Sequence, residues 1–280
     1  MVTGVSNPSY IFLDRHHLQS SKTEELHLSI ELGLNEVSYT IKNDDRVLAI
    51  EHINENLSIF EEKIKNHEWL SKKFKSTNVC LLNQKSTLIP DSLFDLKNKA
   101  NYVSFNHEKT ENHEVLHDKI EPINSYNVYG ISSPVKQLIE THFRDATIRH
   151  HSSSLIVNWI NLYKNNDEKK LIVNIQNQSF QLMMIDKMEL KFFNSFRFQH
   201  NNDFIYHLLF AMEQLKLDSE KIKLYLYGDI LKESDLYQLI YSYIRNVEFG
   251  NRNSLIQLSP VADHIEKHQN FTLLHQHLCV

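Results

Sequence analysis

The stretch Leu26–Ile53, LHLSIELGLNEVSYTIKNDDRVLAIEHI, predicts three short strands joined by tight turns. Apolar and polar residues alternate through its first third, which is the two-residue period of a strand with one buried face. The alternation restarts at Val37 and again at Val47, and Gly33 with several polar residues occupies the gaps. The stretch is therefore predicted to be a three-stranded meander.

The same order of elements is predicted a second time, about half a chain later. In the first copy a helix follows Asn56, a suitable N-cap, and a compact apolar strand begins at Val79. In the second copy, strands at 171–175, 180–185 and 188–193 precede a helix near Asn202 and a strand at 224–227. Corresponding positions of the two copies are separated by nearly equal numbers of residues: 171 − 26 = 145, 202 − 56 = 146 and 224 − 79 = 145. This spacing favours tandem β-β-β-α-β units, and two unrelated mixed sheets are the alternative.

The length and composition are typical of a globular chain with two lobes. The chain has 280 residues, of which 41% are hydrophobic and 23% charged, so each lobe can bury a core of its own. We expect a first lobe at residues 1–168 with an insertion at about 86–120, and a second lobe at 169–280 with a C-terminal segment. Within the insertion we expect a short helix near 91–99, and the polar segment 106–118 is expected to be a surface loop or a mobile hairpin.

Charge and hydropathy exclude several classes of function. The net charge of −5 and the pI of about 6.4 disfavour nucleic-acid binding, which needs a clustered basic face. No apolar run approaches the length of a membrane span, so we expect a cytoplasmic protein. Cys80 lies in a predicted buried strand and Cys279 is next to last, which predicts two free thiols.

The repeated pattern resembles the actin-like (ribonuclease H-like) fold of actin, sugar kinases, heat-shock chaperones and the bacterial cell-division and pilus-assembly actins. Within that superfamily the chain is most similar to an uncharacterised bacterial family of proteins of unknown function with an actin-like ATPase fold. The residues that carry the resemblance are Leu26–Ile41, Thr87–Pro90 with Leu93-Phe94, Tyr126–Tyr129 and the helix after Pro134. None of these motifs is catalytic, so the resemblance implies a fold more than a function.

The nucleotide motifs that the resemblance implies are degenerate. The first phosphate turn, usually Asp-x-Gly followed by small hydroxyl residues, reads Glu31-Leu32-Gly33-Leu34 here. The second falls on Asn174-Ile175-Gln176 or on Gln176-Asn177-Gln178, and neither register keeps the acid or the glycine. The adenosine motif, usually a strand ending in Gly-Gly, matches the strand that ends in Gly228-Asp229. The vestigial groove positions are therefore Glu31, Gly33, Asn174, Gln176, Gln178, Gly228 and Asp229.

The glycine content also indicates that phosphate-binding loops are missing, and this inference does not depend on the resemblance. The chain has only 5 glycines, whereas an average chain of this length has roughly twenty. Loops that cradle phosphate need several glycines close together, because the backbone must approach the ligand closely. We therefore expect no cofactor and no catalytic residue, and no Walker or Gly-x-Gly-x-x-Gly motif exists.

Two further clusters have structural and functional interpretations. The chain contains 17 histidines, and His264 and His268 stand four residues apart, but a histidine-rich helix end explains the pair better than a metal site does. Five tyrosines gather in the second half, and we expect about half of them to pack in the core while the rest are available to an interface. They are Tyr225, Tyr227, Tyr237, Tyr241 and Tyr243.

The function that these observations favour is a catalytically inactive scaffold of the actin-like class. It would bind another protein, or itself, through its lobes or through the insertion. The alternative is a divergent ATPase or small-molecule kinase, and the chemistry of the phosphate turns discriminates between the two.

Overall fold

The computed structural model describes residues 12–44, 46–82, 85–106, 113–187 and 189–279. The chain divides into two compact units, one made of Met1–Val157, Ser254–His264 and Thr272–Val280 and the other of Asn158–Asn253 and Ile265–Phe271. The division falls inside helix α5 (His151–Tyr163), which is continuous through it. Two C-terminal segments thus belong to the first unit.

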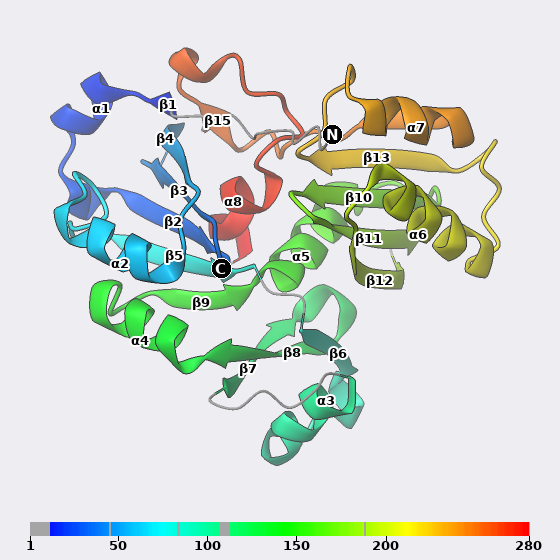
Figure 1. Cartoon of the computed structure of the whole chain (residues 1–280), viewed down its shortest axis with the longest axis horizontal. Coiled ribbons are helices and arrows are strands. Elements are labelled where there is room, and N and C mark those ends of the chain that lie inside the picture. The colour runs from blue at the N-terminus through cyan, green and yellow to red at the C-terminus, as the bar shows by residue number, and fades with distance from the viewer. Residues whose placement is uncertain (1–11, 45, 83–84, 107–112, 188, 280) are drawn as a thin grey trace. The chain divides into compact units, whose positions relative to one another are not determined.

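The first unit is built on a seven-stranded sheet (Figure 1). Its main path runs β1-β4-β3-β2-β5-β9, and β15 adds to β4. β2 pairs antiparallel with β3 and parallel with β5, so the meander continues into a parallel half. The elements, in chain order, are β1 (Phe12–Leu13), α1 (Arg15–Ser20), β2 (His27–Leu32), β3 (Val37–Lys42), β4 (Arg46–Ile53), α2 (Leu57–Asn66), β5 (Ser76–Leu81), α4 (Ser133–His142), β9 (Thr147–His150) and β15 (Gln257–Leu258).

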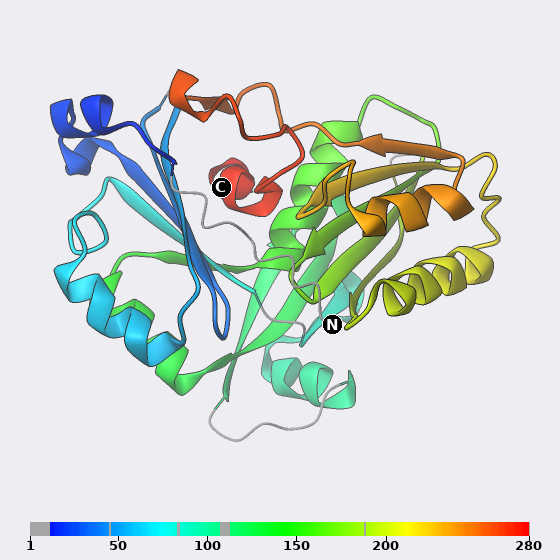
Figure 2. The same cartoon turned by 45° about the horizontal axis from the view of Figure 1, so that its top comes forward.

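The second unit contains a five-stranded sheet in the order β12-β11-β10-β13-β14. Helices α6 and α7 contact each other and cover one face of this sheet (Figure 2). A β-bulge between Met184 and Ile185 interrupts the pairing of β11 with β12. The elements are β10 (Lys170–Gln176), β11 (Ser179–Asp186), β12 (Glu189–Arg197), α6 (Asn201–Gln214), β13 (Lys223–Gly228), α7 (Asp235–Tyr243) and β14 (Asn246–Phe249). Helix α8 (Phe271–His275) begins at the last residue of this unit, and its other residues belong to the first unit.

The two sheets share one topology, which confirms the predicted repeat of β-β-β-α-β units. In each, an antiparallel meander is followed by a helix and by a strand parallel to the first strand of the meander. Each repeat then adds a second helix and a fifth strand, which is parallel to the fourth. These are α4 and β9 in the first unit and α7 and β14 in the second. The helix–strand crossovers exist because parallel neighbours need a long connection.

The alternating pattern of the sequence explains these sheets. Leu28 and Ile30 of β2 are almost fully buried and join the core of the first unit. That core also holds Phe60 and Ile64 of α2, because residues four apart lie on one face of a helix. Asn56 caps α2 as predicted, since its side chain accepts a hydrogen bond from the amide of Ile59 at 3.1 Å.

The insertion forms a three-stranded antiparallel sheet in the order β6-β8-β7, and α3 contacts all three strands. It comprises β6 (Ser86–Pro90), 3₁₀ turns at Asp91–Leu93 and Leu96–Asn98, α3 (Lys99–Asn106), β7 (His113–Ile120) and β8 (Ser125–Ser132). Residues 113–118, expected to be loop or hairpin, belong to strand β7, and residues 107–112 lie outside the described part of the chain. The helix expected near 91–99 begins only at Lys99, after the two 3₁₀ turns.

Candidate functional site

The turn after β2 is closed by a backbone hydrogen bond, and the side chain of Glu36 lies beside its glycine. The amide of Gly33 donates to the carbonyl of Glu36 at 2.9 Å, which closes the hairpin between β2 and β3. A Cβ added to Gly33 would lie 2.9 Å from Cγ of Glu36 and 3.4 Å from its carboxylate oxygen Oε1. The side chain of Leu34 is 81% exposed at the tip. The space in front of Gly33 therefore holds a carboxylate, which repels phosphate.

Glu31, the residue that matches the metal-positioning acid, is buried in β2. The register of the sheet places it opposite Ser38 of β3 and Cys80 of β5. Gly33 lies two residues further along, in the turn. The first unit thus brings together the acid and glycine that sequence analysis selected, within one strand and its turn.

In the second unit, the turn that matches the second phosphate motif is a two-residue hairpin between Gln176 and Ser179. Asn174 is buried, and its side-chain amide donates to Oε1 of Gln181 at 2.9 Å across the hairpin. Gln178 is exposed, and its carbonyl accepts the amide of Phe198 at 3.1 Å. The side chain of Asn174 and the backbone carbonyl of Gln178 are therefore engaged in hydrogen bonds within the sheet and its edge.

Gly228 ends β13 in the left-handed region, at φ +86°. A Cβ there would lie 2.0 Å from the carbonyl oxygen of Ile175, so glycine is required where the end of β13 pairs with the end of β10. The amide of Gly228 donates to the carbonyl of His268 at 3.0 Å, and the amide of Asp229 donates to Ile175 at 2.8 Å. Both amides at the matched adenosine position are thus satisfied by the chain.

Aromatic side chains fill the space beside Gly228. The Tyr227 ring lies against Gly250, where an added Cβ would be only 2.0 Å from it. Tyr227 also packs against Trp159 and Phe271, with ring centroids 5.8 and 4.5 Å away, and its hydroxyl lies 2.9 Å from that of Tyr163. Burial raises the pKa of Tyr227, so its hydroxyl stays protonated. This end of β13 is packed core.

The predicted tyrosine cluster separates into core and surface positions. Tyr227 and Tyr237 are buried, and Tyr225 is half-buried. Tyr241 and Tyr243, on α7, are 52% and 50% exposed. The expectation that about half would pack in the core is met by these positions.

The insertion presents an apolar surface that sequence analysis did not single out. Leu93, Leu96 and Phe105 are 68%, 57% and 89% exposed, and we call these three side chains the insertion surface. The Phe94 ring, beside them in the chain, stacks on Tyr126 with centroids 3.9 Å apart.

A buried carboxylate fixes the insertion to the first unit. Asp118 of β7 accepts hydrogen bonds from the Tyr129 hydroxyl of β8 and from the amide of His150 at the end of β9, each at 2.8 Å. Burial raises the pKa of Asp118, while the hydrogen bonds from Ser153, His150 and Tyr129 oppose that shift. The insertion surface is therefore presented on a firmly attached sheet.

Histidine positions offer no grouped metal ligands. His268 is buried, and its Nε2 lies 2.7 Å from the carbonyl of Ile230, so it donates there. The described residues hold no cluster of three or more histidine, cysteine, aspartate or glutamate side chains suited to a metal ion. In the same part of the chain, no helix has the length and apolar character that crossing a membrane requires.

The repeated topology defines the class as an actin-like fold, and comparisons with solved structures agree. A Bacteroides thetaiotaomicron protein of actin-like ATPase fold and unknown function superposes with a TM-score of 0.74 at 22% identity, covering 81% of this chain and 91% of its own. A chain of the PilM–PilN type IV pilus biogenesis complex superposes with a TM-score of 0.59 at 12% identity, and the match covers 92% of this chain and 97% of that chain. Identities this low show the fold alone.

The chain belongs to the family described as "Protein of unknown function (DUF3822)", which it matches over residues 15–247. No curated protein matches the sequence. The resemblance to an uncharacterised family with an actin-like fold is thereby confirmed, and the family description names no function.

Proposed function

We propose that this protein is a catalytically inactive actin-like scaffold that binds another protein through the insertion surface. The observation that carries the proposal is that none of the three matched nucleotide positions keeps a free glycine amide. The side chain of Glu36 lies beside Gly33, and the amide of Gly228 donates to the carbonyl of His268. The hairpin between Gln176 and Ser179 contains no glycine.

The electrostatics of the first turn support the loss of phosphate binding. Phosphate sites in proteins use free backbone amides and positive charge. Here the Gly33 amide already has an acceptor, and the carboxylate that shares the turn adds negative charge. A triphosphate at this position would meet repulsion and find no free donor at Gly33.

The insertion surface supports the binding half of the proposal. Leu93, Leu96 and Phe105 are exposed on an element whose attachment through Asp118 is buried and hydrogen-bonded. Exposed apolar side chains of this size on a rigid element are typical of protein-binding sites, and aromatic residues are enriched at the centres of such sites. The PilM–PilN assembly, of the same fold, is described as a complex, which supports a partner-binding role here.

A divergent ATPase is the second candidate, because β2 retains a buried acid at Glu31 followed by Gly33. A single acid and glycine supply one side of a phosphate clamp. Thermal unfolding of the protein with and without Mg-ATP separates this candidate from the scaffold.

Partner capture tests the binding half. The full chain, tagged and immobilised, is used to capture proteins from a lysate of its source, in parallel with Leu93→Ser and Phe105→Ser. Val261→Ser is the matched control, because Val261 is 60% exposed outside the insertion. We expect one stoichiometric partner to be retained by the parent and the control and to be lost by both insertion variants. A partner captured equally by all four proteins, or no partner at all, would contradict the proposal.

A further inference from the structure

We propose that the outer face of α6 binds a partner segment that carries arginine. The side chains that form this face are Asp203, Tyr206, Phe210 and Glu213, and we call them the α6 stripe. The stripe belongs to the second unit, whereas the insertion surface belongs to the first. The inference therefore goes beyond the proposed function and is independent of it.

Helical spacing places the four side chains of the stripe in one row. They stand at i, i+3, i+7 and i+10 of α6, which is the spacing of neighbours on one face of a helix. The opposite face of α6 is buried in the core of the second unit, as Phe204 and Leu208 show. The α6 stripe thus faces away from that core.

Two aromatic rings occupy the middle of the stripe. Tyr206 is 63% exposed and Phe210 is 48% exposed. The two rings are nearly parallel, with centroids 6.1 Å apart and an angle of 17° between their planes. The His207 ring contacts Tyr206 at 5.4 Å and packs on Phe196 of β12 at 5.2 Å, so the row is supported by the edge of the sheet. The rings therefore form a preformed surface for a flat group.

The helices that cover this sheet carry carboxylates and no basic residue. The ranges of α6 and α7 include Asp203, Glu213 and Asp235, and they contain neither lysine nor arginine. Glu213 is exposed, and no hydrogen bond or ion pair involves its carboxylate among the residues that the structure describes. The amides of His200 and Gln199 donate to Asp203 and hold its pKa below the usual value, so Asp203 stays ionised.

Arginine is the side chain that matches both the rings and the charge. Its planar guanidinium stacks on aromatic faces and pairs with a carboxylate through two parallel hydrogen bonds, whereas lysine supplies charge without a flat face. Residues three or four apart on a helix have Cβ atoms about 5–6 Å apart, so a guanidinium over the Phe210 ring can reach the carboxylate of Glu213.

The charges of the stripe disfavour a second copy of the chain as the occupant. In an antiparallel pair of α6 helices centred on the two rings, Asp203 of each copy would face Glu213 of the other. Like charges in contact across an interface repel and suppress that pairing. A basic partner instead neutralises both carboxylates while it covers the rings.

The test uses the full chain and two labelled peptides of equal length, one with four arginines and one with four lysines at the same positions. Fluorescence anisotropy gives the Kd of each peptide at an ionic strength of about 0.15 M. We expect saturable binding of the arginine peptide and at least about threefold weaker binding of the lysine peptide. Phe210→Ala and Glu213→Gln should each weaken binding of the arginine peptide at least about threefold.

Two matched controls lie in the first unit. Glu62→Gln removes the same charge as Glu213→Gln from an exposed position on α2, and Leu255→Ala truncates an apolar side chain that is 74% exposed. Both should keep the parent's affinity for the arginine peptide. They separate the stripe from the general attraction of cations to a chain with a net charge of −5.

Three results would overturn the inference: no saturable binding of the arginine peptide, equal affinity for the two peptides, or the same affinity in Glu213→Gln as in Glu62→Gln. Unchanged binding in Phe210→Ala would overturn it as well. If Phe210→Ala fails to fold, Tyr206→Ala takes its place under the same criterion. The insertion surface takes no part in these measurements, so this inference and the proposed function can fail separately.

Discussion

The side chain of Glu36 lies against the backbone of Gly33, with its Cγ 2.9 Å from the position a Cβ would take. The turn itself is closed by the hydrogen bond from the Gly33 amide to the Glu36 carbonyl. The neighbouring acid, Glu31, is buried in β2. In the scaffold that we propose, the Glu36 carboxylate lies where a phosphate group would approach the turn matched to the nucleotide motif.

The contact between Tyr227 and Gly250 gives a stability prediction. Gly250→Ala would place a Cβ 2.0 Å from the Tyr227 ring, so we expect the free energy of unfolding to fall by about 2 kcal/mol or more. Gly130→Ala is the control, because its Cβ would meet His113 at an ordinary 3.4 Å and should change stability by less than about 1 kcal/mol. Urea denaturation measures both. Equal effects of the two substitutions would mean that Tyr227 does not fill this end of β13.

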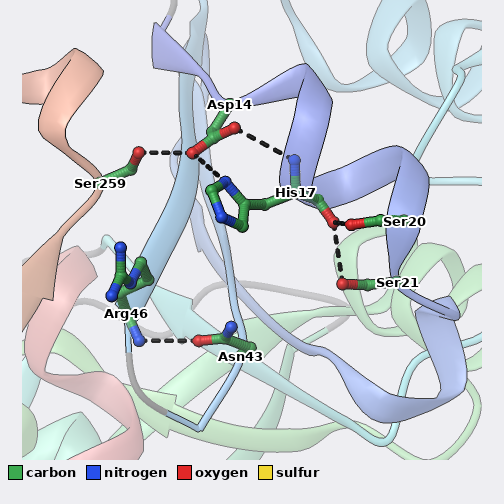
Figure 3. A network of polar contacts seen from close by, with 7 residues as sticks. All are labelled: Asp14, His17, Ser20, Ser21, Asn43, Arg46 and Ser259. Atoms are coloured by element: carbon green, nitrogen blue, oxygen red, sulfur yellow. Dashed lines mark hydrogen bonds and ion pairs between the residues drawn. The ribbon is translucent and has the colours of Figure 1, made fainter.

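The hydrogen bond between Asp14 and Ser259 joins segments distant in the sequence (Figure 3). The Ser259 hydroxyl donates to Asp14 at 2.5 Å, and Asp14 also accepts the amide of His17 at 3.1 Å as the cap of α1. Ser259→Ala should lower the free energy of unfolding by about 2 kcal/mol, because the bond is to a charged group. Ser21→Ala, whose exposed hydroxyl donates to His17, should change it by less than about 0.5 kcal/mol.

Acid should weaken the same bond. Burial tends to raise the pKa of Asp14, but the hydrogen bonds from Ser259 and His17 outweigh it and hold the pKa below its usual value. The stability that ionised Asp14 contributes is therefore fully present above about pH 4 and is lost as pH falls through the pKa of Asp14 in the folded state. In Ser259→Ala the loss of stability below about pH 4 should be smaller than in the parent. An identical acid response in both proteins would contradict this account.

His151 predicts a second pH dependence, in a higher range. The ring is fully buried, which lowers its pKa to about 4, although a hydrogen bond to the Leu81 carbonyl opposes the shift. A histidine whose folded pKa is depressed stabilises the fold above the unfolded value of about 6.5 and loses that contribution as pH falls toward 4. The loss for this residue alone is about 2 kcal/mol at pH 5.

The comparison is between the parent, His151→Gln and the exposed control His16→Gln, by urea denaturation at pH 7 and pH 5. The free energy of unfolding falls between pH 7 and pH 5, and this fall should be smaller by about 2 kcal/mol in His151→Gln than in the parent. It should be the same in His16→Gln as in the parent. Asp118, whose pKa burial raises, acts in the opposite direction in all three proteins and cancels in the comparison. An unchanged difference in His151→Gln would mean that the ring is not held neutral in the folded state.

The repeat could be predicted from the sequence because its signal is local. Alternation at 26–53 specifies which face of each strand is buried, and Asn56 marks the start of α2. The fifth strand of the second sheet, Asn246–Phe249, was missed because it is four residues long and only half-buried, so no alternation identifies it. The 3₁₀ turns at Asp91–Leu93 and Leu96–Asn98 delay α3 in a way that helical periodicity does not show.

The site was predictable only in part. The role of Gly33 and Gly228 as vestigial groove positions stays a prediction, which the sequence alone supplied. The sequence could not reveal that the Tyr227 ring packs on Gly250, because that contact depends on β13 and β14 lying side by side in the sheet.

Binding of Mg-ATP tests the central claim, the loss of the nucleotide site, most directly. Ligand at about a hundred times its dissociation constant stabilises a fold by roughly 2.7 kcal/mol, which raises Tm by about 5 °C in a chain of this size. The measurement uses the full chain in phosphate-free buffer, so that inorganic phosphate does not compete with the triphosphate. We predict no saturable rise in Tm with millimolar Mg-ATP. A saturable rise of that size that Glu31→Ala abolishes would contradict the scaffold and establish the divergent ATPase.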